Sequence, residues 1–239
     1  MKKYKTLSIV VPVYNEEKFI VGVIREIIRV ESLGLKKEII IVNDGSSDST
    51  LSKLNSLKRL SKDIRIISRR KNIGKGYSLK EGFMASHGDV VIVQDSDKEY
   101  SPGDYPLLLK PFLKDYADVV YGSRLLTSES HRVLFFWHDK ANKFLTLLSN
   151  LFTNLNLTDM ETGFKVFKGE IIRKIAPKLK SKRFGFEPEV TARIARLKDI
   201  RIFEVGISYS GRTYKEGKKI GWTDGLIAIW EIIKYNILQ

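Results

Sequence analysis

The first half of the chain alternates short, almost wholly apolar runs with stretches in which apolar residues recur every three or four positions. The apolar runs predict buried strands, and the spaced stretches predict helices. Strands are expected at 7–14, 37–44, 64–69, 89–95 and 118–124, and helices at 16–32, at 78–86 and from Ser47 or Asp48 to Leu60. Apolar strands that alternate with helices indicate a parallel sheet covered by helices on both faces. The sequence therefore predicts an α/β fold.

The second half has a less regular pattern. We expect a helix at 144–152, a strand and then a helix within 162–176, a helix at 187–198, a strand at 200–210 and an apolar helix at 221–238. No internal repeat, low-complexity tract or linker divides the chain. Its 239 residues suit one large domain, so the sequence predicts a single domain over residues 1–239.

Each predicted strand of the first half ends in polar or charged residues. Because the carboxyl ends of parallel strands lie at one edge of a sheet, these side chains are expected to gather along a single rim. Ligands of such sheets bind in the crevice beyond that rim. The rim residues are Tyr14 to Glu16, Asn43 and Asp44, Arg69 and Arg70, Asp95 to Asp97, and Ser123 and Arg124.

The segment VVIVQDSDKEYSP (90–102) carries an apolar strand directly into two carboxylates, Asp95 and Asp97. Two like charges at this spacing repel each other unless a cation or hydrogen bonds offset them. Oxygen ligands at the rim suit a hard divalent cation such as Mg2+ or Mn2+, which completes its coordination with waters and substrate phosphates. A solvated acidic turn is the alternative interpretation, and the preceding buried strand favours the metal.

The stretch GKGYSL (74–79) is a second candidate for contact with phosphate. It begins like a glycine-rich dinucleotide motif, but Leu79 stands at the third glycine position, and no P-loop sequence occurs in the chain. Two interpretations of Gly74 stay open. Its backbone N–H lies near a nucleotide at a helix start, or the glycine forms a tight turn that opens the helix.

The amino-acid composition says more about the expected binding partners than about the fold. The chain has 42 Lys and Arg against 28 Asp and Glu, and this net charge of +14 favours an anionic partner, with solvated lysine-rich faces as the alternative. Nucleic acid is not expected, because no motif interleaves aromatic with base-reading residues. The absence of cysteine excludes disulfides and thiolate metal sites. No apolar stretch reaches the roughly 18–20 residues that span a bilayer, so we expect a cytoplasmic protein with peripheral contact at the cytoplasmic membrane face as its only membrane association.

Eight ordered motifs resemble those of a known family. VVPVYNEE, IIIVNDGSSDST, NIGKGYSL and QDSDKEYSP resemble successive signatures of family 2 glycosyltransferases with the GT-A fold. YGSR, LTDMETGFKVFK, FGFEPEV and GRTYKEGKKIGWTDGLIAIW are similar to the branch containing dolichyl-phosphate mannose synthase and polyprenyl-phosphate glucosyltransferases. The resemblance covers nearly the whole chain. It implies one GT-A domain with a Rossmann-like, mostly parallel sheet, divided into a nucleotide-binding half at 1–124 and an acceptor-binding half at 125–239.

The same resemblance implies roles for individual residues. The nucleotide would be bound by Pro12, Tyr14, Glu16, Asp44, Gly74 and Asp95, and a Mg2+ or Mn2+ ion on its diphosphate by Asp95, Asp97 and Glu99. The catalytic set would be Asp97, Arg124, Arg212 and Lys219, of which the last two hold the departing diphosphate. The acceptor would be bound by Arg124, Arg132, Asp159 and Thr162.

The implied reaction is inverting transfer of a hexose from a nucleotide sugar, with GDP-mannose favoured and UDP-glucose as the alternative donor. The expected acceptor is a polyprenyl or dolichyl phosphate, which is largely ionised at neutral pH and needs no general base. A sugar or glycan hydroxyl, the alternative acceptor, would need a carboxylate base. Asp159, Glu161 and Glu187 are the candidates, although the first two also suit a loop cap and Glu187 also suits a helix N-terminus.

Two features bear on a lipid acceptor. The run HRVLFFWH (131–138) places apolar residues beside Arg132, which suits a lipid-linked ligand or an interfacial contact, with core packing as the alternative. In contrast to many relatives, the sequence shows no transmembrane pair after the helix at 221–238, which counts against membrane anchorage.

The alternative outside enzymes is a basic module that binds nucleic acid or membranes, and it predicts no dependence on the acidic rim.

Overall fold

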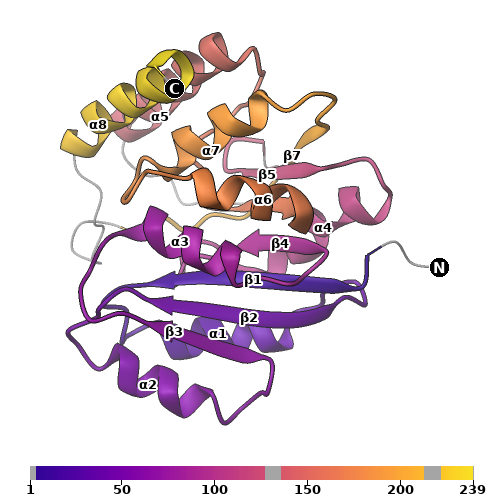
Figure 1. Cartoon of the computed structure of the whole chain (residues 1–239), viewed down its shortest axis with the longest axis vertical. Helices are drawn as coiled ribbons and strands as arrows, with labels where there is room; N and C mark the ends of the chain where they lie inside the picture. The colour runs from indigo at the N-terminus through magenta and orange to yellow at the C-terminus, as the bar shows by residue number, and fades with distance from the viewer. Residues whose placement is uncertain (1–3, 127–135, 213–221, 239) are drawn as a thin grey trace.

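A seven-stranded sheet forms the centre of the structure, a computed structural model that describes residues 4–126, 136–212 and 222–238. The sheet has the order β3-β2-β1-β4-β6-β5-β7 (Figure 1). Its strands are β1 (Thr6–Val13), β2 (Lys36–Asn43), β3 (Ile64–Ser68), β4 (Val90–Val93), β5 (Val119–Ser123), β6 (Lys165–Lys168) and β7 (Ile202–Gly206).

Helices cover both faces of this sheet, as the alternating pattern predicts. One face packs against α1 (Ile20–Arg29), α2 (Thr50–Leu57) and α4 (Tyr105–Leu113), and the other against α3 (Lys75–Met84), α6 (Gly169–Ile175) and α7 (Phe186–Ala195). An outer pair, α5 (Phe136–Thr153) and α8 (Trp222–Ile233), lies side by side against α7 (Figure 1). Short turns of helix occupy Pro102–Asp104, Ala176–Lys178 and Lys234–Leu238.

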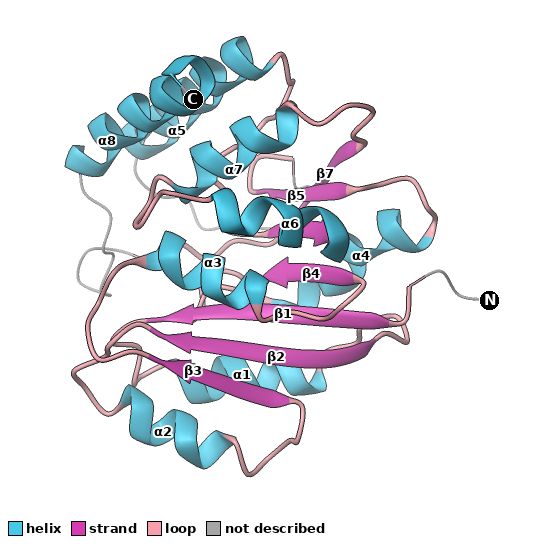
Figure 2. Ribbon diagram, in the orientation of Figure 1, coloured by secondary structure: helices cyan, strands magenta, loops and turns pink. Residues whose placement is uncertain are grey.

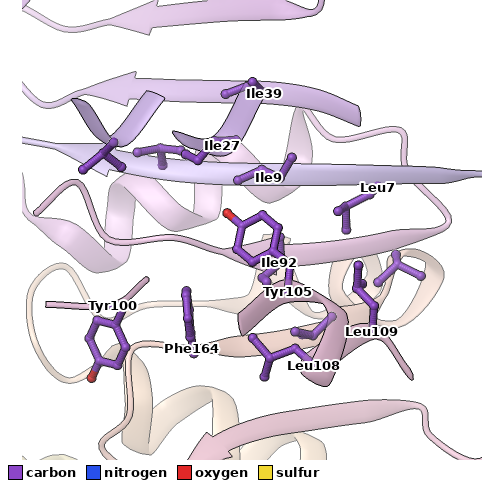
Figure 3. Packing of buried hydrophobic residues seen from close by; sticks show 14 of the residues in the cluster. Leu7, Ile9, Ile27, Ile39, Ile92, Tyr100, Tyr105, Leu108, Leu109 and Phe164 are labelled. Atoms are coloured by element: carbon purple, nitrogen blue, oxygen red, sulfur yellow. The ribbon is translucent and has the colours of Figure 1, made fainter. Parts of the chain in front are cut away.

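The central strands β1 and β4 consist mostly of apolar residues because each face of the sheet has its own core. Ile9 and Val11 point into the core that contains α1 and α4, while Val10 between them points into the core that contains α3 and α7. Figure 3 shows the first core, in which Ile9 and Ile92 of the sheet meet side chains of α1 and α4. This two-sided burial explains why the runs in the sequence show no polar alternation.

One strand runs against the rest. All neighbouring strands pair in parallel except β6, which is antiparallel to both β4 and β5. Because its direction is reversed, the loop that precedes β6 lies at the same rim as the loops that follow the parallel strands. The predicted fold class, a mostly parallel sheet with helices on both faces, is confirmed.

Several predicted boundaries differ from the structure. The helix expected at 144–152 begins at Phe136, so the apolar residues Phe136 and Trp137 belong to α5. Helix α2 begins at Thr50 with Ser49 at its N-cap position, so the predicted caps Ser47 and Asp48 lie just before the helix. The Asp48 side chain still accepts the Thr50 N–H at 2.9 Å. Within the described ranges, none of the helices combines the length and apolar character that a bilayer crossing requires.

Candidate functional site

The polar rim that the sequence predicts exists in the structure. The parallel pairing of β1, β2, β3 and β4 brings their carboxyl ends to one side of the sheet, where their arrowheads lie together in Figure 2. Asp95 and Asp97 follow β4 at this edge. The reversed direction of β6 adds the loop 159–164 from the second half of the chain. The rim therefore combines residues from both halves of the sequence.

Asp95 is paired with a lysine from the start of α3. Lys75 Nζ lies 2.9 Å from Asp95 Oδ1 and 3.1 Å from Glu187 Oε1, so one ammonium group bridges two carboxylates. Burial alone would lower the pKa of Lys75, but the two carboxylates raise it well above its ordinary value. Lys75 therefore stays charged and links the Asp95 carboxylate to Glu187, a residue from the second half of the chain.

Asp97 is paired with Arg212. One Asp97 oxygen accepts from Arg212 Nη2, and the other accepts the backbone N–H of Glu99 at 3.0 Å. Arg212 Nη1 also lies 3.7 Å from Glu16 Oε1. Burial, together with the charges of Asp95 and Glu99, raises the pKa of Asp97 to about 7, although Arg212 opposes the shift. The surroundings of Asp97 therefore hold more negative charge than the described residues neutralise.

Glu99 has a different role from the predicted one. Its carboxylate accepts the backbone N–H of Arg212 at 3.0 Å, the Arg212 Nε–H at 3.2 Å and the Tyr209 hydroxyl at 3.0 Å. Among the residues that the structure describes, no three acidic or histidine side chains converge as a metal site. The predicted ligand set of Asp95, Asp97 and Glu99 is therefore not assembled here, because Glu99 ties the segment 209–212 to the turn after β4.

Asp95 and Asp97 still fit a divalent cation. Magnesium in nucleotide sites is commonly held by one or two carboxylates and the substrate phosphates, so two protein ligands suffice. Both side chains keep partial access to solvent, at 18% and 14% of their surface. The raised pKa of Asp97 shows that an additional positive charge beside these carboxylates would stabilise their ionised form. A metal at this pair stays a prediction.

Arg124 forms a buried ion pair with Asp159 at the end of β5. Arg124 Nε and Nη2 each lie 2.7 Å from one oxygen of Asp159, whose side chain is fully buried. Asn142 and the backbone N–H of Arg124 donate to the same carboxylate at 3.0 Å. Burial would raise the pKa of Asp159, but Arg124 and these donors lower it below its ordinary value. Asp159 is therefore a poor proton acceptor, and it positions Arg124.

The loop before β6 is held rigidly against Asp95. Lys165 is fully buried and donates to the backbone carbonyls of Met160 and Thr162. Tyr100 accepts the Gly163 N–H at 2.9 Å through its hydroxyl, and a Cβ at Gly163 would lie only 2.4 Å from Asp95 Oδ2. Thr162, predicted to bind the acceptor, is itself buried and accepts the Phe164 N–H at 3.3 Å, so in this geometry it supports the loop.

Two carboxylates beside this loop have an oxygen without a partner. Glu161 Oε1 and Glu187 Oε2 are buried and accept no hydrogen bond from any residue in the described parts of the chain. Burial and the charge of Glu187 raise the pKa of Glu161 to about 8. Unsatisfied buried acceptors are costly, so a ligand that donates hydrogen bonds to them would be stabilised. Hydroxyl groups are the donors that would satisfy them.

The predicted nucleotide contacts occupy the ends of the first two strands. Pro12 is buried within β1 opposite Val42, Tyr14 is 38% exposed just beyond the strand, and Glu16 is buried next to Arg212. Tyr14 is thus the predicted nucleotide residue that presents most surface to solvent. The contacts of these three residues with a nucleotide stay predictions.

Asp44 and Gly74 bond to each other instead of facing open space. Asp44 is 2% exposed and accepts the N–H groups of Ile73 at 2.9 Å and Gly74 at 2.6 Å. Gly74 has a φ of 124°, and a Cβ there would lie 2.2 Å from the carbonyl oxygen of Lys182. The tight-turn interpretation therefore describes Gly74 in this structure, where Asp44 accepts its N–H. A contact of Gly74 with a nucleotide stays a prediction.

Two predicted site residues fall outside the described part of the chain, and three residues that contact the site were not predicted from the sequence. Arg132 and Lys219 lie outside the described residues. Lys75, Lys165 and Tyr209 were not predicted, yet all three contact predicted site residues or their loops. Lys165 stands at the start of the apolar pair Val166 and Phe167 in β6, and a lysine beside buried strand residues was the available signal.

Comparisons with known proteins bear on the family and the fold of this chain. The sequence profile described as Glycosyl transferase family 2 matches residues 8–176. The dolichyl-phosphate beta-glucosyltransferase of Dictyostelium discoideum is 29% identical over 218 residues, and the dolichyl-phosphate beta-glucosyltransferase ALG5D of Trichomonas vaginalis is 26% identical over 218 residues. In each case 85% of this chain is covered. The chain spans 66% and 65% of these relatives, which is just under two thirds of their length.

Solved structures show the same fold. Glucosyl-3-phosphoglycerate synthase from Mycobacterium tuberculosis, in complex with Mn2+, UDP and phosphoglyceric acid, has a TM-score of 0.70 and 22% identity over 98% of this chain and 79% of its own. The same enzyme with Mn2+ and UDP-glucose also has a TM-score of 0.70, with 20% identity over 97% of this chain and 77% of its own. At this identity the likeness establishes the fold only.

Proposed function

Because this chain belongs to glycosyl transferase family 2, we propose that it transfers a hexose from a nucleotide sugar to a polyprenyl phosphate. The observation that carries the proposal is the pair Asp95 and Asp97 at the end of β4, each facing a cation of the chain, Lys75 or Arg212. Carboxylates and cations placed together in this way suit a diphosphate with a divalent metal. The two halves of the sequence would supply the donor side and the acceptor side of one site.

The sugar that the relatives favour is glucose. The curated relatives are named dolichyl-phosphate beta-glucosyltransferases, and the structural neighbours include complexes with UDP and UDP-glucose. The comparisons give no support to the expected mannose and GDP-mannose. We therefore propose UDP-glucose as the donor.

The carboxylates of the site favour a phosphate acceptor over a hydroxyl. A hydroxyl acceptor needs an ionised carboxylate as general base. Asp159 is locked to Arg124, Glu187 is paired with Lys75, and Glu161, with a pKa of about 8, is mostly protonated at neutral pH. A phosphate monoester is already largely ionised and needs no base. This arrangement supports the polyprenyl phosphate in preference to a sugar hydroxyl.

In this reaction the residues of the chain would act mainly by placing charge. When bound, a Mg2+ or Mn2+ ion on Asp95 and Asp97 would offset the charge that builds on the departing diphosphate. Arg212 would donate to the diphosphate, and Arg124, fixed by Asp159, would orient the acceptor phosphate. Glu161 and Glu187 would accept hydrogen bonds from hydroxyl groups of the hexose through their unpartnered oxygens. Preorganised donors of this kind typically contribute about 10²–10³ in rate each.

A test of the proposal measures release of the nucleoside diphosphate. The protein is incubated with Mn2+ and a panel of nucleotide sugars, with and without polyprenyl phosphate or soluble sugars. We expect release from UDP-glucose that depends on the lipid phosphate. Asp97→Asn should abolish metal-dependent release while the fold stays intact, and Asp63→Asn, at an exposed acid far from the rim, should leave it unchanged. No turnover of any donor with any acceptor would contradict the proposal.

A lipid-linked acceptor also requires contact with a membrane, and we propose α5 and α8 for this role. These neighbouring helices expose large apolar side chains: Phe136, Trp137, Phe144, Leu147 and Leu151 on α5, and Leu226, Ile227 and Trp230 on α8. Exposed apolar patches of this kind mark binding surfaces, and tryptophan is common at membrane interfaces. Trp137→Ser should weaken co-sedimentation with lipid vesicles, whereas Leu60→Ser, at an exposed leucine beyond α2, should not. Equal binding of both variants would contradict this role.

A further inference from the structure

We propose that Arg212 is a built-in counter-ion of Asp97 that a divalent cation must displace, and that the nucleotide diphosphate accepts the displaced guanidinium. Cation and nucleotide would then bind cooperatively, each raising the affinity for the other. The inference rests on the proposed function, because it assumes a nucleoside diphosphate as ligand.

The structure leaves neither oxygen of Asp97 without a bond. Arg212 Nη2 donates to Oδ2, and the backbone N–H of Glu99 donates to Oδ1 at 3.0 Å. The Glu99 bond comes from the turn itself and persists whenever the turn is folded. The Arg212 bond comes from a distant part of the sequence and a flexible side chain. A cation that binds Asp97 therefore competes with Arg212.

Charge repulsion makes the competition strong. A divalent ion on Asp97 would bring two positive charges next to the guanidinium, and like charges at such short distances repel each other strongly in a partly buried site. The backbone of Arg212 need not follow its side chain. The Arg212 N–H donates to Glu99 at 3.0 Å, and Ser210 N–H and the Tyr209 hydroxyl also donate to Glu99 at 3.0 Å. The segment stays tethered while the guanidinium moves.

A nucleoside diphosphate would give the displaced guanidinium a new partner. Arginine binds phosphate oxygens through two parallel N–H groups, and such charge-assisted bonds are among the strongest in proteins. With the diphosphate present, the Arg212 Nη2 group that the cation displaces from Asp97 gains a new acceptor, while Arg212 Nε can keep its bond to Glu99 at 3.2 Å. Because coupling of two ligands is reciprocal, the nucleotide must raise cation affinity by the same factor as the cation raises nucleotide affinity.

The test compares binding of Mn2+ alone and Mn2+ with UDP, measured by calorimetry on the whole chain. For the wild type we expect weak binding of Mn2+ alone and a clear gain on addition of UDP. Arg212→Met should bind Mn2+ alone at least about fivefold more tightly, and UDP should enhance that binding less, since typical coupling factors run from about 5 to 150. Arg59→Met removes an equal charge from an exposed position near the start of β3 and should change neither value.

A second readout follows the guanidinium directly. In the protein labelled with 15N-arginine, the Nε–H resonance that disappears in Arg212→Met should shift when Mg2+ and UDP are added. If Arg212→Met does not fold, Arg212→Lys replaces it, because a single ammonium cannot hold Asp97 and Glu99 together as a fork does. That variant should also bind Mn2+ alone more tightly than the wild type.

Three results would overturn the proposal: unchanged Mn2+ affinity in the folded variant, unchanged enhancement by UDP, or an Arg212 resonance that does not move. None of them depends on turnover. If the wild type releases no nucleoside diphosphate from any donor while the binding results are as expected, then the proposed function fails and the counter-ion role stands. The two ideas can therefore be refuted separately.

Discussion

Replacing Gly163 by alanine should disable the site while changing only one methyl group. A Cβ at this position would lie 2.4 Å from Asp95 Oδ2 and 2.9 Å from Tyr100 Cε2, whereas ordinary contacts begin at 3.4 Å. The carboxylate or the loop must therefore move by about 1 Å. The loop cannot retreat freely, because the Gly163 N–H donates to the Tyr100 hydroxyl at 2.9 Å and Lys165 holds the carbonyl of Thr162.

The expected size of the effect follows from this clash. Overpacking of a rigid region costs about 1–3 kcal/mol of stability. A displacement of about 1 Å at a catalytic carboxylate costs about 10² in rate. Asp95 also carries the ion pair with Lys75 at 2.9 Å, which the displacement would lengthen. We expect kcat/KM to fall about 100-fold and the Mn2+ concentration needed for half-maximal activity to rise.

The assay is steady-state release of nucleoside diphosphate at several Mn2+ concentrations, with thermal unfolding as the check on folding. Gly225→Ala is the matched control, because a Cβ at this position of α8 meets nothing within 4 Å. An alanine inside a helix should leave activity unchanged and stabilise the fold by roughly 0.5–1 kcal/mol. A folded Gly163→Ala protein with full activity and unchanged Mn2+ dependence would refute the close contact with Asp95.

Three further predictions concern the buried charges. Arg124→Met leaves the carboxylate of Asp159 buried without its cation and should cost about 3–5 kcal/mol in urea unfolding, part of which Asp159→Asn should restore in the double variant. Burial raises the pKa of Glu161 from 4.5 to about 8. The stability that protonated Glu161 contributes is therefore complete below pH 4.5 and is lost as the pH rises through 8. The melting temperature of Glu161→Gln should rise relative to that of the wild type as the pH increases from 5 to 8.5. Burial acts to raise the pKa of Asp118, but Arg201 lowers it below 3.8. The stability that ionised Asp118 contributes is therefore present above pH 3.8 and is lost in acid. Asp118→Asn should be less stable than the wild type at pH 7, and it should lose less further stability than the wild type as the pH falls toward 2.

The strands could be predicted because the two-sided core leaves a simple pattern. Val90 to Val93 are all fully buried and alternate between the two cores, so every position of β4 must be apolar. The direction of β6 left no such mark, since an antiparallel strand buried on both faces has the same composition as a parallel one. Residue patterns therefore predicted that this segment is a strand and gave no information about which rim its loop would join.

The strand pattern by itself predicted site residues only where a charge follows a strand, and residues such as Glu99 and Arg212 were predicted from the family resemblance. Asp95, Asp97 and Arg124 stand at strand ends, and the structure brings them to one rim. The partners that fix them come from far away in the sequence: Arg212 lies 115 residues from Asp97, and the role of Glu99 as a tether depends on that contact. Such pairings depend on tertiary packing, and no local spacing encodes them.

The charge of the whole chain and the charge of the site act in opposite directions. The net charge of +14 attracts an anionic donor from solution, although at physiological salt this attraction extends only about 8 Å. Among the described residues in contact around Asp95 and Asp97, carboxylates outnumber their cation partners: Glu16, Asp95, Asp97, Glu99 and Glu187 share Lys75 and Arg212. A diphosphate that reached this rim alone would be repelled by the excess. Addition of a divalent cation removes most of that excess, so the protein should hold its donor firmly only when the cation accompanies it.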